Sequence, residues 1–383
     1  KRQDIYNKYY DELEKTQHVY PCFCSDQQLA ISRKVQLAAG HPPRYAGTCR
    51  QLTPEQIAEK KSEGLQPTLR FKVPESEIIQ FTDLVRGVQT FNSRDIGDFI
   101  IRRADGTASF FFCNAIDDAV MSVTHALRGD DHLTNTPRQL LILDALGLTP
   151  PQYGHIALII GFDGSPLSKR HGSRSVKELR EEGFLPLAIV NYLSRLGHYY
   201  AEPHFMEFDT LSAKFDPTAL GSAPSRFDPT QLIHWQKEAI AHSTNEALWM
   251  WMGEEVHNHV PAQHRELFIT IVRHNIVFPQ DALHWVAILF SEKMTYTANA
   301  IEVIRVTGSE FFNMAVNFLP ETGTDVRQLT QKLQEKFGLK GKALFQPLRA
   351  AIMGELSGPE MLPIVQLLGA DTLRVRLQHA ANL

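Results

Sequence analysis

The spacing of apolar residues changes along this chain, and this change constrains the fold more than any single motif does. Residues 67–113 alternate apolar and polar side chains, as in PTLRFKVP, which is typical of antiparallel strands. From about residue 244 onward, segments such as NEALWMWM and RELFITIVRH repeat apolar residues with a period of about 3.6, which is typical of amphipathic helices. We therefore predict a multidomain chain in which an α/β part precedes an all-helical module.

Residues 114–172 combine strand-like runs with a helix. The runs MSVTHAL and HIALIIGF flank the helical segment TPRQLLILDALG, where Thr136 can cap the helix and Pro137 lies in its first turn. This order is typical of one half of a parallel sheet with a crossover helix. Just before it, the Asp-Gly pair at 105–106 predicts a hairpin turn, so the segment TASFFF that follows should be a strand.

The composition excludes several classes of protein. The 383 residues are 43% hydrophobic and 21% charged, with a net charge of −4, which excludes a disordered or collagen-like chain. No apolar run reaches the roughly 20 residues that span a membrane. Four cysteines are too few for a disulfide scaffold and favour a reducing, cytoplasmic location. Residues 324–383 carry eight Lys or Arg against five Asp or Glu, which favours a phosphate-contacting end, although surface solvation explains the excess nearly as well.

The first residues have a helical pattern without a helix start. Ile5, Tyr9 and Leu13 are apolar at a spacing of four, yet neither an initiator Met nor a capping residue precedes them. We expect from this that the sequence lacks its true beginning.

The sharpest local motif is PLSKRHG at residues 166–172, which follows a strand-like run and a turn. A hydroxyl and two adjacent cations, Ser168, Lys169 and Arg170, suit a polyphosphate ligand. The alternative is a solvated surface loop, because such pairs of charges are common on protein surfaces.

A second polar cluster, from His125 to His132, follows the acidic pair Asp117 and Asp118. In an open α/β sheet, ligands bind at the carboxyl ends of the strands, where this cluster is expected. Arg128 could bind a substrate carboxylate through two parallel hydrogen bonds. An acid–base network that only holds the edge of the sheet is the alternative.

Three cysteines are spaced as metal ligands could be. Cys22 and Cys24 lie in one turn, and Cys49 lies in the next, with Tyr45 four residues before it. Three thiolates and a Tyr, or His41, would make a tetrahedral zinc site, whereas buried reduced thiols are the alternative. The fourth cysteine, Cys113, lies beside three phenylalanines and is expected in the core.

Taken together, these segments resemble bacterial glutamyl-tRNA synthetase, a class I aminoacyl-tRNA synthetase. The resemblance is collinear over essentially the whole chain. It rests on the strings CFCS, RYAGTCR, TLRFKVP, FTDLVRG, DFIIRRADG, DDAVMSVTHALRGDDHLTNTPRQLLILDALG, YGHIALIIGFDGSPLSKRHGS, VKELREEGFLPLAIVNYLSRLG and GKALFQPLRAAIMG.

The resemblance implies a reaction and its participants. Glutamate would be activated by ATP with Mg²⁺ to glutamyl-adenylate and then transferred to the 3′-terminal adenosine of tRNA(Glu). The implied partners are L-glutamate and tRNA(Glu), without DNA or membrane, and the implied enzyme is a cytoplasmic monomer with a structural Zn²⁺.

The resemblance also implies roles for individual residues. Phe110 and Asn114 would lie on the strand of the substrate pocket. The implied residues are Lys169, Ser168 and Arg170 for catalysis, Lys169, Asp131, Ile159 and His155 for ATP, Arg128, Asn114 and Phe110 for glutamate, and Cys22, Cys24, Tyr45 and Cys49 for the metal.

The implied fold is a class I synthetase with a Rossmann-type catalytic domain, of which the second half is present. The implied domains are the end of the first Rossmann half (1–19), an inserted acceptor-binding domain with the zinc loop (20–109), the second Rossmann half (110–162), the catalytic loop and stem-contact domain (163–241) and an α-helical anticodon-binding cage (242–383).

The chain departs from the family pattern in several places. The HIGH-type signature, which the family carries upstream, is absent, Phe110 replaces the usual Tyr, and Ala287 stands where some relatives carry an Arg near the last anticodon base. The alternatives are therefore a paralogue that charges tRNA(Gln) with glutamate and a non-catalytic tRNA-binding remnant. A zinc-dependent DNA-binding protein is disfavoured, because the net charge is −4 and no recognition helix follows the cysteines.

Overall fold

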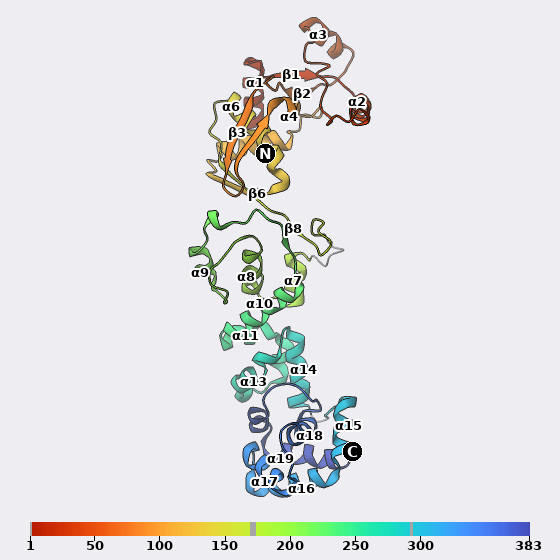
Figure 1. Ribbon diagram of the computed structural model, residues 1–383, viewed down its shortest axis with the longest axis vertical. Helices are drawn as coiled ribbons and strands as arrows, with labels where there is room; N and C mark the ends of the chain where they lie inside the picture. Colours follow the sequence, from red (N-terminus) through yellow and green to blue (C-terminus); the bar gives the residue numbers. More distant parts are fainter. Residues whose placement is uncertain (1, 169–173, 292–293) are drawn as a thin grey trace. The chain divides into compact units, whose positions relative to one another are not determined.

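The computed structural model describes residues 2–168, 174–291 and 294–383 (Figure 1). The chain forms two compact units. The N-terminal unit consists of Lys1–Leu167, Leu196–Ala201 and Lys214–Phe227. The helical unit consists of Ser168–Arg195, Glu202–Ala213 and Asp228–Leu383. Within the described residues, no helix is long and apolar enough to cross a membrane.

An antiparallel sheet of three strands lies in the N-terminal unit, in the order β1 (Val19–Cys22), β2 (Thr68–Phe71) and β5 (Phe99–Arg102). The helices α1 (Gln3–Lys15) and α5 (Phe110–Val120) share its hydrophobic core. They meet where the ring of Tyr10 stacks on Phe112, with centroids 4.2 Å apart.

Besides β2, three helices and a hairpin lie between β1 and β5. The helices α2 (Asp26–Ala38) and α3 (Pro54–Ser62) each begin with a capping box and bury none of their residues. The hairpin of β3 (Ile78–Asp83) and β4 (Gly87–Asn92) pairs in antiparallel register, and the short helix α4 (Ser93–Ile96) follows it.

A parallel pair of strands provides the frame of the candidate site. The strands β6 (His125–Gly129) and β7 (Gln152–Ile156) are joined by the 3₁₀ turn η1 (Asp130–Asn135) and the helix α6 (Thr136–Ala145). This is the strand–helix–strand unit that the sequence predicts.

A shorter parallel pair follows, formed by β8 (Ile159–Ile160) and β9 (Ser225–Arg226). The other regular elements after residue 174 are helical. Its helical elements are α7 (Val176–Glu182), α8 (Pro186–Gly197), α9 (Phe208–Ala213), η3 (Pro217–Ala219), α10 (Pro229–His242), α11 (Asn245–Met252), α12 (Glu254–His259), η4 (Ala262–His264), α13 (Arg265–Val272), η5 (Arg273–Asn275), α14 (Pro279–Phe290), α15 (Ala298–Thr307), α16 (Ser309–Thr322), α17 (Val326–Phe337), α18 (Lys342–Met353) and α19 (Met361–Ala381).

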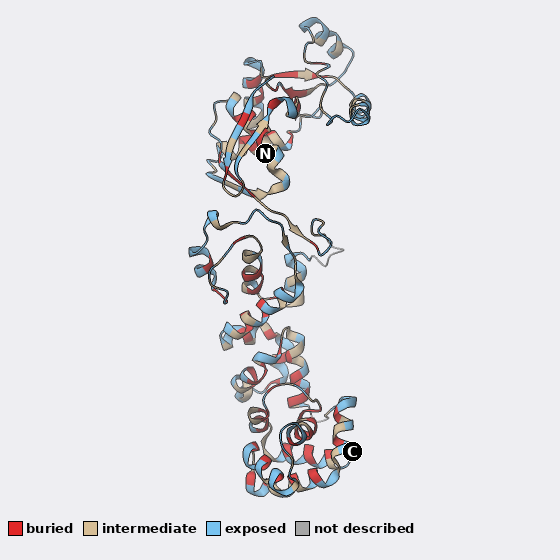
Figure 2. Cartoon of the chain, in the orientation of Figure 1, coloured by how far each residue is buried: buried red, intermediate tan, exposed pale blue. Residues whose placement is uncertain are grey.

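One continuous hydrophobic core joins helices α10 to α19. Its centre is the contact of α16 with α19, where Phe311, Phe312 and Leu373 are almost fully buried. Helix α19 breaks at Gly369, whose φ of 74° favours glycine. The apolar faces that the sequence predicts from a period of about 3.6 are the buried faces in Figure 2.

Three local predictions were wrong. The segment at 110–113 begins helix α5 instead of a second hairpin strand, because Phe112, Ala115 and Ile116 bury one helical face. Thr136 is the first residue of α6 and makes no capping bond there. Cys113 is half-buried and not a core residue. The predicted turn is present, since the N–H of Arg103 donates to Thr107.

The basic C-terminal segment is less available to phosphates than its composition indicates. Arg376 is buried, and its guanidinium donates to the carbonyl groups of Ile352 and Ile288. At least one of the eight cations therefore stabilises the helical core.

Candidate active site

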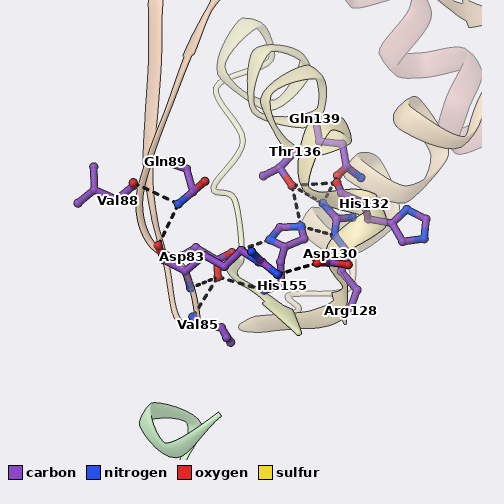
Figure 3. A network of polar contacts seen from close by, with 11 residues as sticks. Asp83, Val85, Val88, Gln89, Arg128, Asp130, His132, Thr136, Gln139 and His155 are labelled. Atoms are coloured by element: carbon purple, nitrogen blue, oxygen red, sulfur yellow. Dashed lines mark hydrogen bonds and ion pairs between the residues drawn. The ribbon is translucent and has the colours of Figure 1, made fainter. Parts of the chain in front are cut away.

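The guanidinium of Arg128, near the carboxyl end of β6, is the centre of a polar network (Figure 3). Its Nε donates to Nε2 of His155 at 3.1 Å, and Nη1 donates to Oδ1 of Asn114 at 3.3 Å. Its Nη2 donates to Oγ1 of Thr136 at 2.7 Å and to Oε1 of Gln139 at 2.6 Å. Four bonds from three nitrogens fix the plane of this cation at a ligand-binding edge of the sheet.

His155 on β7 carries the network to a buried carboxylate. Its ring is fully buried, and Nδ1 lies 2.5 Å from Oδ2 of Asp83, which ends β3. Burial opposes ionisation of Asp83, but hydrogen bonds from the side chain and main chain of His155 hold its pKa below the usual range. Burial lowers the pKa of His155 despite Asp83. The pair is therefore a carboxylate and a neutral imidazole, whose proton lies on Nδ1 and whose Nε2 accepts.

The predicted glutamate residues are brought together, with one change of element. Asn114 and Phe110 lie one turn apart on helix α5, and not on a strand as expected. Oδ1 of Asn114 accepts from Arg128 and also, at 2.6 Å, from Nε2 of Gln139. The Phe110 side chain is 44% exposed and lies 5.3 Å from the His132 ring.

The acidic pair before β6 is divided between two tasks. Asp117 pairs with Nε of Arg2 at 2.7 Å and accepts from the Tyr6 hydroxyl at 2.8 Å, so it holds helix α1. Burial raises the pKa of Asp118, while the charge of Arg128 opposes the rise. Asp118 is therefore the member of the pair whose pKa depends on the charge of Arg128.

The predicted ATP residues are less tightly grouped. Asp131 is exposed and lies 3.8 Å from His132, while the carbonyl of Ile159 accepts from Leu167. The His155 ring does not have the exposure of an ATP contact, because it is buried and both nitrogens are engaged. Ser168 is half-buried, and Lys169 and Arg170 lie outside the described residues.

The predicted metal ligands lie together. In the part of the chain that the structure describes, the Sγ atoms of Cys22, Cys24 and Cys49 form a cluster within 4.8 Å. The Tyr45 hydroxyl lies 3.3 Å from Cys22 and 3.5 Å from Cys24, whereas His41 is exposed and outside the cluster. Three thiolates supply three ligands of a tetrahedral Zn²⁺ site. The Tyr45 oxygen lies beside them, and burial and its hydrogen bonds with the thiols raise the pKa of Tyr45, so it would be a neutral fourth donor.

The electrostatics of this cluster also suit a cation. Burial opposes ionisation of Cys22, but hydrogen bonds from Tyr45 and Arg70 lower its pKa to about 7. Burial and the two neighbouring thiols raise the pKa of Cys24 to about 11. A thiolate among crowded thiols is the arrangement that a bound dication would stabilise.

Two family matches divide the chain. Residues 1–234 match the family described as tRNA synthetases class I (E and Q), catalytic domain, and residues 246–381 match an anticodon binding domain. Glutamate–tRNA ligase 2 of Coxiella burnetii (strain RSA 493) is 51% identical over 382 residues, which are 100% of this chain and 82% of that protein. The chain belongs to the glutamate–tRNA ligase family. It is thus a class I aminoacyl-tRNA synthetase, and the predicted family, fold class and ligase activity are confirmed.

Other members of the family agree. Glutamate–tRNA ligase 2 of Nitrosococcus oceani is 52% identical over 381 residues, covering 100% of this chain and 81% of that protein. The crystal structure of a glutamate tRNA ligase from Elizabethkingia meningosepticum, in complex with its amino acid, matches with a TM-score of 0.87 at 23% identity. It covers 100% of this chain and 82% of that one, which supports the fold.

Sequence reasoning missed three members of the Arg128 network, namely Asp83, Thr136 and Gln139. Asp83 lies in FTDLVRG, a string that carries the resemblance, but nothing in that string indicates a partner 72 residues away. Thr136 and Gln139 are one helical turn apart at the start of α6, so both face the strand ends.

Proposed function

We propose that this synthetase activates L-glutamate with ATP and Mg²⁺ and transfers it to the 3′-terminal adenosine of tRNA(Glu). The observation that carries the proposal is the fixed guanidinium of Arg128 near the carboxyl end of β6. Four of its five N–H groups are engaged in bonds within the described structure, which sets the direction of the remaining Nη1 hydrogen. Arg128 would bind a substrate carboxylate there, with Asn114 and Phe110 as neighbours.

Activation forms one bond and breaks one. An oxygen of the glutamate α-carboxylate attacks the α-phosphorus of ATP, and the bond to the bridging oxygen breaks as pyrophosphate leaves with its electron pair. Lys169 would neutralise charge on the leaving pyrophosphate, with Ser168 and Arg170 assisting, and Asp131 and Ile159 would contact ATP. In the second step a ribose hydroxyl of the tRNA attacks the carbonyl carbon, and AMP leaves.

Pyrophosphate exchange tests the reaction. We expect the intact protein to exchange labelled pyrophosphate into ATP only when glutamate and cognate tRNA are both present. Arg128→Lys should raise the KM for glutamate roughly tenfold or more, because an ammonium cannot keep the four bonds that orient the one remaining Nη1 hydrogen. The two parallel bonds to a carboxylate that the sequence suggests for Arg128 are not available in this arrangement. The matched control is Arg138→Lys in α6, whose Nη1 donates to Thr134 outside the network. Exchange that depends on glutamine instead would contradict the proposal.

Charging of tRNA(Gln) is the second candidate function. Ala287 is exposed on helix α14, where its methyl group offers no hydrogen bond to a base. A chain without an Arg at this position could accept both tRNAs. Aminoacylation of purified tRNA(Glu) and tRNA(Gln), compared by kcat/KM, separates the two functions.

A structural zinc ion fits the cluster of Cys22, Cys24, Cys49 and Tyr45. Four protein ligands would close the coordination sphere and join β1 to the loop before α3, without an open position for chemistry. The enzyme would work as a cytoplasmic monomer, with residues 246–381 contacting the anticodon. The grouped donors support the zinc assignment, and the family match supports the contact with the anticodon.

A further inference from the structure

Asp83 belongs to the active-site network, but none of the steps above uses it. Its Oδ1 accepts from the main-chain N–H groups of Val85, Arg86 and His155 at 3.0, 2.9 and 3.1 Å. Within the described residues, its Oδ2 is hydrogen-bonded only to the His155 ring. One oxygen therefore holds the turn after β3 and the main chain of β7, and the other accepts from the His155 ring.

Asp83 is linked to Arg128 through two hydrogen bonds of the His155 imidazole. Arg86, on the same turn, extends instead to Asp130, with Nη2 to Oδ2 at 2.6 Å. The Asp83 and His155 side chains are both fully buried, so water screens neither of them. A buried carboxylate is retained only where its hydrogen bonds are satisfied, and the ring of His155 supplies one of those bonds.

The tautomer of His155 determines what Arg128 can do. Because Asp83 holds the proton on Nδ1, Nε2 is an acceptor for Nε of Arg128 and lies 3.0 Å from the Thr136 hydroxyl. Gln139 presents its oxygen to Arg128 because its Nε2 donates to Asn114. Each acceptor around the guanidinium is thus oriented by a second bond.

We propose that Asp83 and His155 are positioning residues for glutamate, which fix the guanidinium plane of Arg128 through an Asp83–His155–Arg128 relay. The relay rests on the proposed role of Arg128 in binding the substrate carboxylate. It makes the hairpin of β3 and β4 part of the amino-acid site, although neither residue of the pair touches substrate.

Asp83→Asn is the direct test, because it preserves shape and reverses one hydrogen bond. The amide oxygen can keep the three main-chain bonds, while the amide NH₂ donates to Nδ1 of His155. The ring proton then moves to Nε2, where it opposes the Nε–H of Arg128. We expect the KM for glutamate to rise roughly tenfold or more, with the KM for ATP changed little.

Two variants of His155 separate hydrogen bonding from packing. His155→Gln retains an acceptor and a donor at the end of the side chain, so this variant should keep most of the wild-type affinity for glutamate. His155→Leu fills similar space without any polar atom and should resemble Asp83→Asn. If Asp83→Asn does not fold, the Gln and Leu variants carry the test.

A matched control is available in Asp98, another buried carboxylate of the same unit. It accepts from the Tyr20 hydroxyl at 2.6 Å, from Nη1 of Arg50 at 2.7 Å and from the Val73 N–H at 2.8 Å. None of the bonds recorded for Asp98 in the described residues reaches Arg128. Asp98→Asn should lower the melting temperature and leave the KM for glutamate unchanged.

The outcomes distinguish failure of the relay from failure of the proposed role of Arg128 in binding glutamate. If Asp83→Asn folds with a wild-type KM for glutamate while Arg128→Lys is impaired, the relay is overturned and the role of Arg128 stands. If Arg128→Lys itself keeps the wild-type KM, both are overturned. If Asp83→Asn and Asp98→Asn lose activity equally through kcat alone, Asp83 is only structural. A rise in KM confined to Asp83→Asn and His155→Leu supports the relay.

Discussion

Arg128 and His155 are direct neighbours across the parallel strands β6 and β7, and Nε of the arginine donates to Nε2 of the histidine at 3.1 Å. The register of the sheet therefore sets the geometry of the site. A shift of β7 by one residue would turn His155 to the opposite face from Arg128, so the position of this guanidinium depends on the strand register.

Stability should fall on the acid side because of His155. Burial lowers its pKa below the usual 6.5, so the folded protein binds a proton there less readily than the unfolded chain. The contribution of His155 to the free energy of unfolding is then fully present above pH ~6.5 and is lost as the pH falls through the lowered pKa. Urea unfolding at pH 7.5 and pH 5 measures the loss.

The variant His155→Gln provides the control for this pH dependence. The titratable groups that face its ring in the described residues are Asp83 from β3, Arg128 from β6, His132 from η1 and Tyr153 from β7. In His155→Gln the loss between these two pH values should shrink, because the titrating ring is gone. An unchanged loss would show that His155 is not its source.

Close packing around Gly154 should make a larger residue at this position destabilising. A Cβ built on Gly154 would lie 2.6 Å from Cδ2 of Leu127 and 3.3 Å from Cβ of Leu84. Gly154→Ala must therefore displace the Leu127 side chain or shift β7, and should cost about 1–3 kcal/mol of unfolding free energy and raise the KM for glutamate.

Gly197→Ala is the matched control for Gly154→Ala. A Cβ there would meet Ile156 at 3.5 Å, an ordinary van der Waals contact. Its stability and KM should stay close to wild type. Equal effects of the two substitutions would show that the strand contact is not tight.

The sequence predicts the order of elements better than it predicts the network. The helix at Pro186–Gly197 and the strand–helix–strand unit follow from local periodicity, which needs no knowledge of distant contacts. Helix α5 was misread because a short apolar run has the same appearance in a helix and a strand. Asp83 was missed because its role depends on a contact with His155, and a lone Asp in a strand gives no sign of its partner.

The cysteine cluster was predictable because its ligands lie in two neighbouring turns. We expect purified protein to hold about one zinc ion per chain, measured by elemental analysis. Cys49→Ser should lose the metal and lower the melting temperature, since the ion would join β1 to a loop. The control is Cys113→Ser, which is outside the cluster. Wild-type protein that is free of metal at full stability would contradict the assignment.

Lys169 should carry much of the charge stabilisation in adenylate formation. Removal of its ammonium by Lys169→Ala should slow glutamate-dependent pyrophosphate exchange by ~10²-fold or more, as expected when one oriented charge is lost from a reacting site. The matched control is Lys177→Ala in α7, where the ammonium is 3.8 Å from Glu181 and its side chain is 82% exposed. That exposed pair contributes little, so the control should keep the wild-type rate. Because the charge is needed as pyrophosphate leaves, Lys169→Ala should lower kcat more than it raises the KM for ATP. A wild-type rate for Lys169→Ala, or the same loss in both variants, would refute the assigned role.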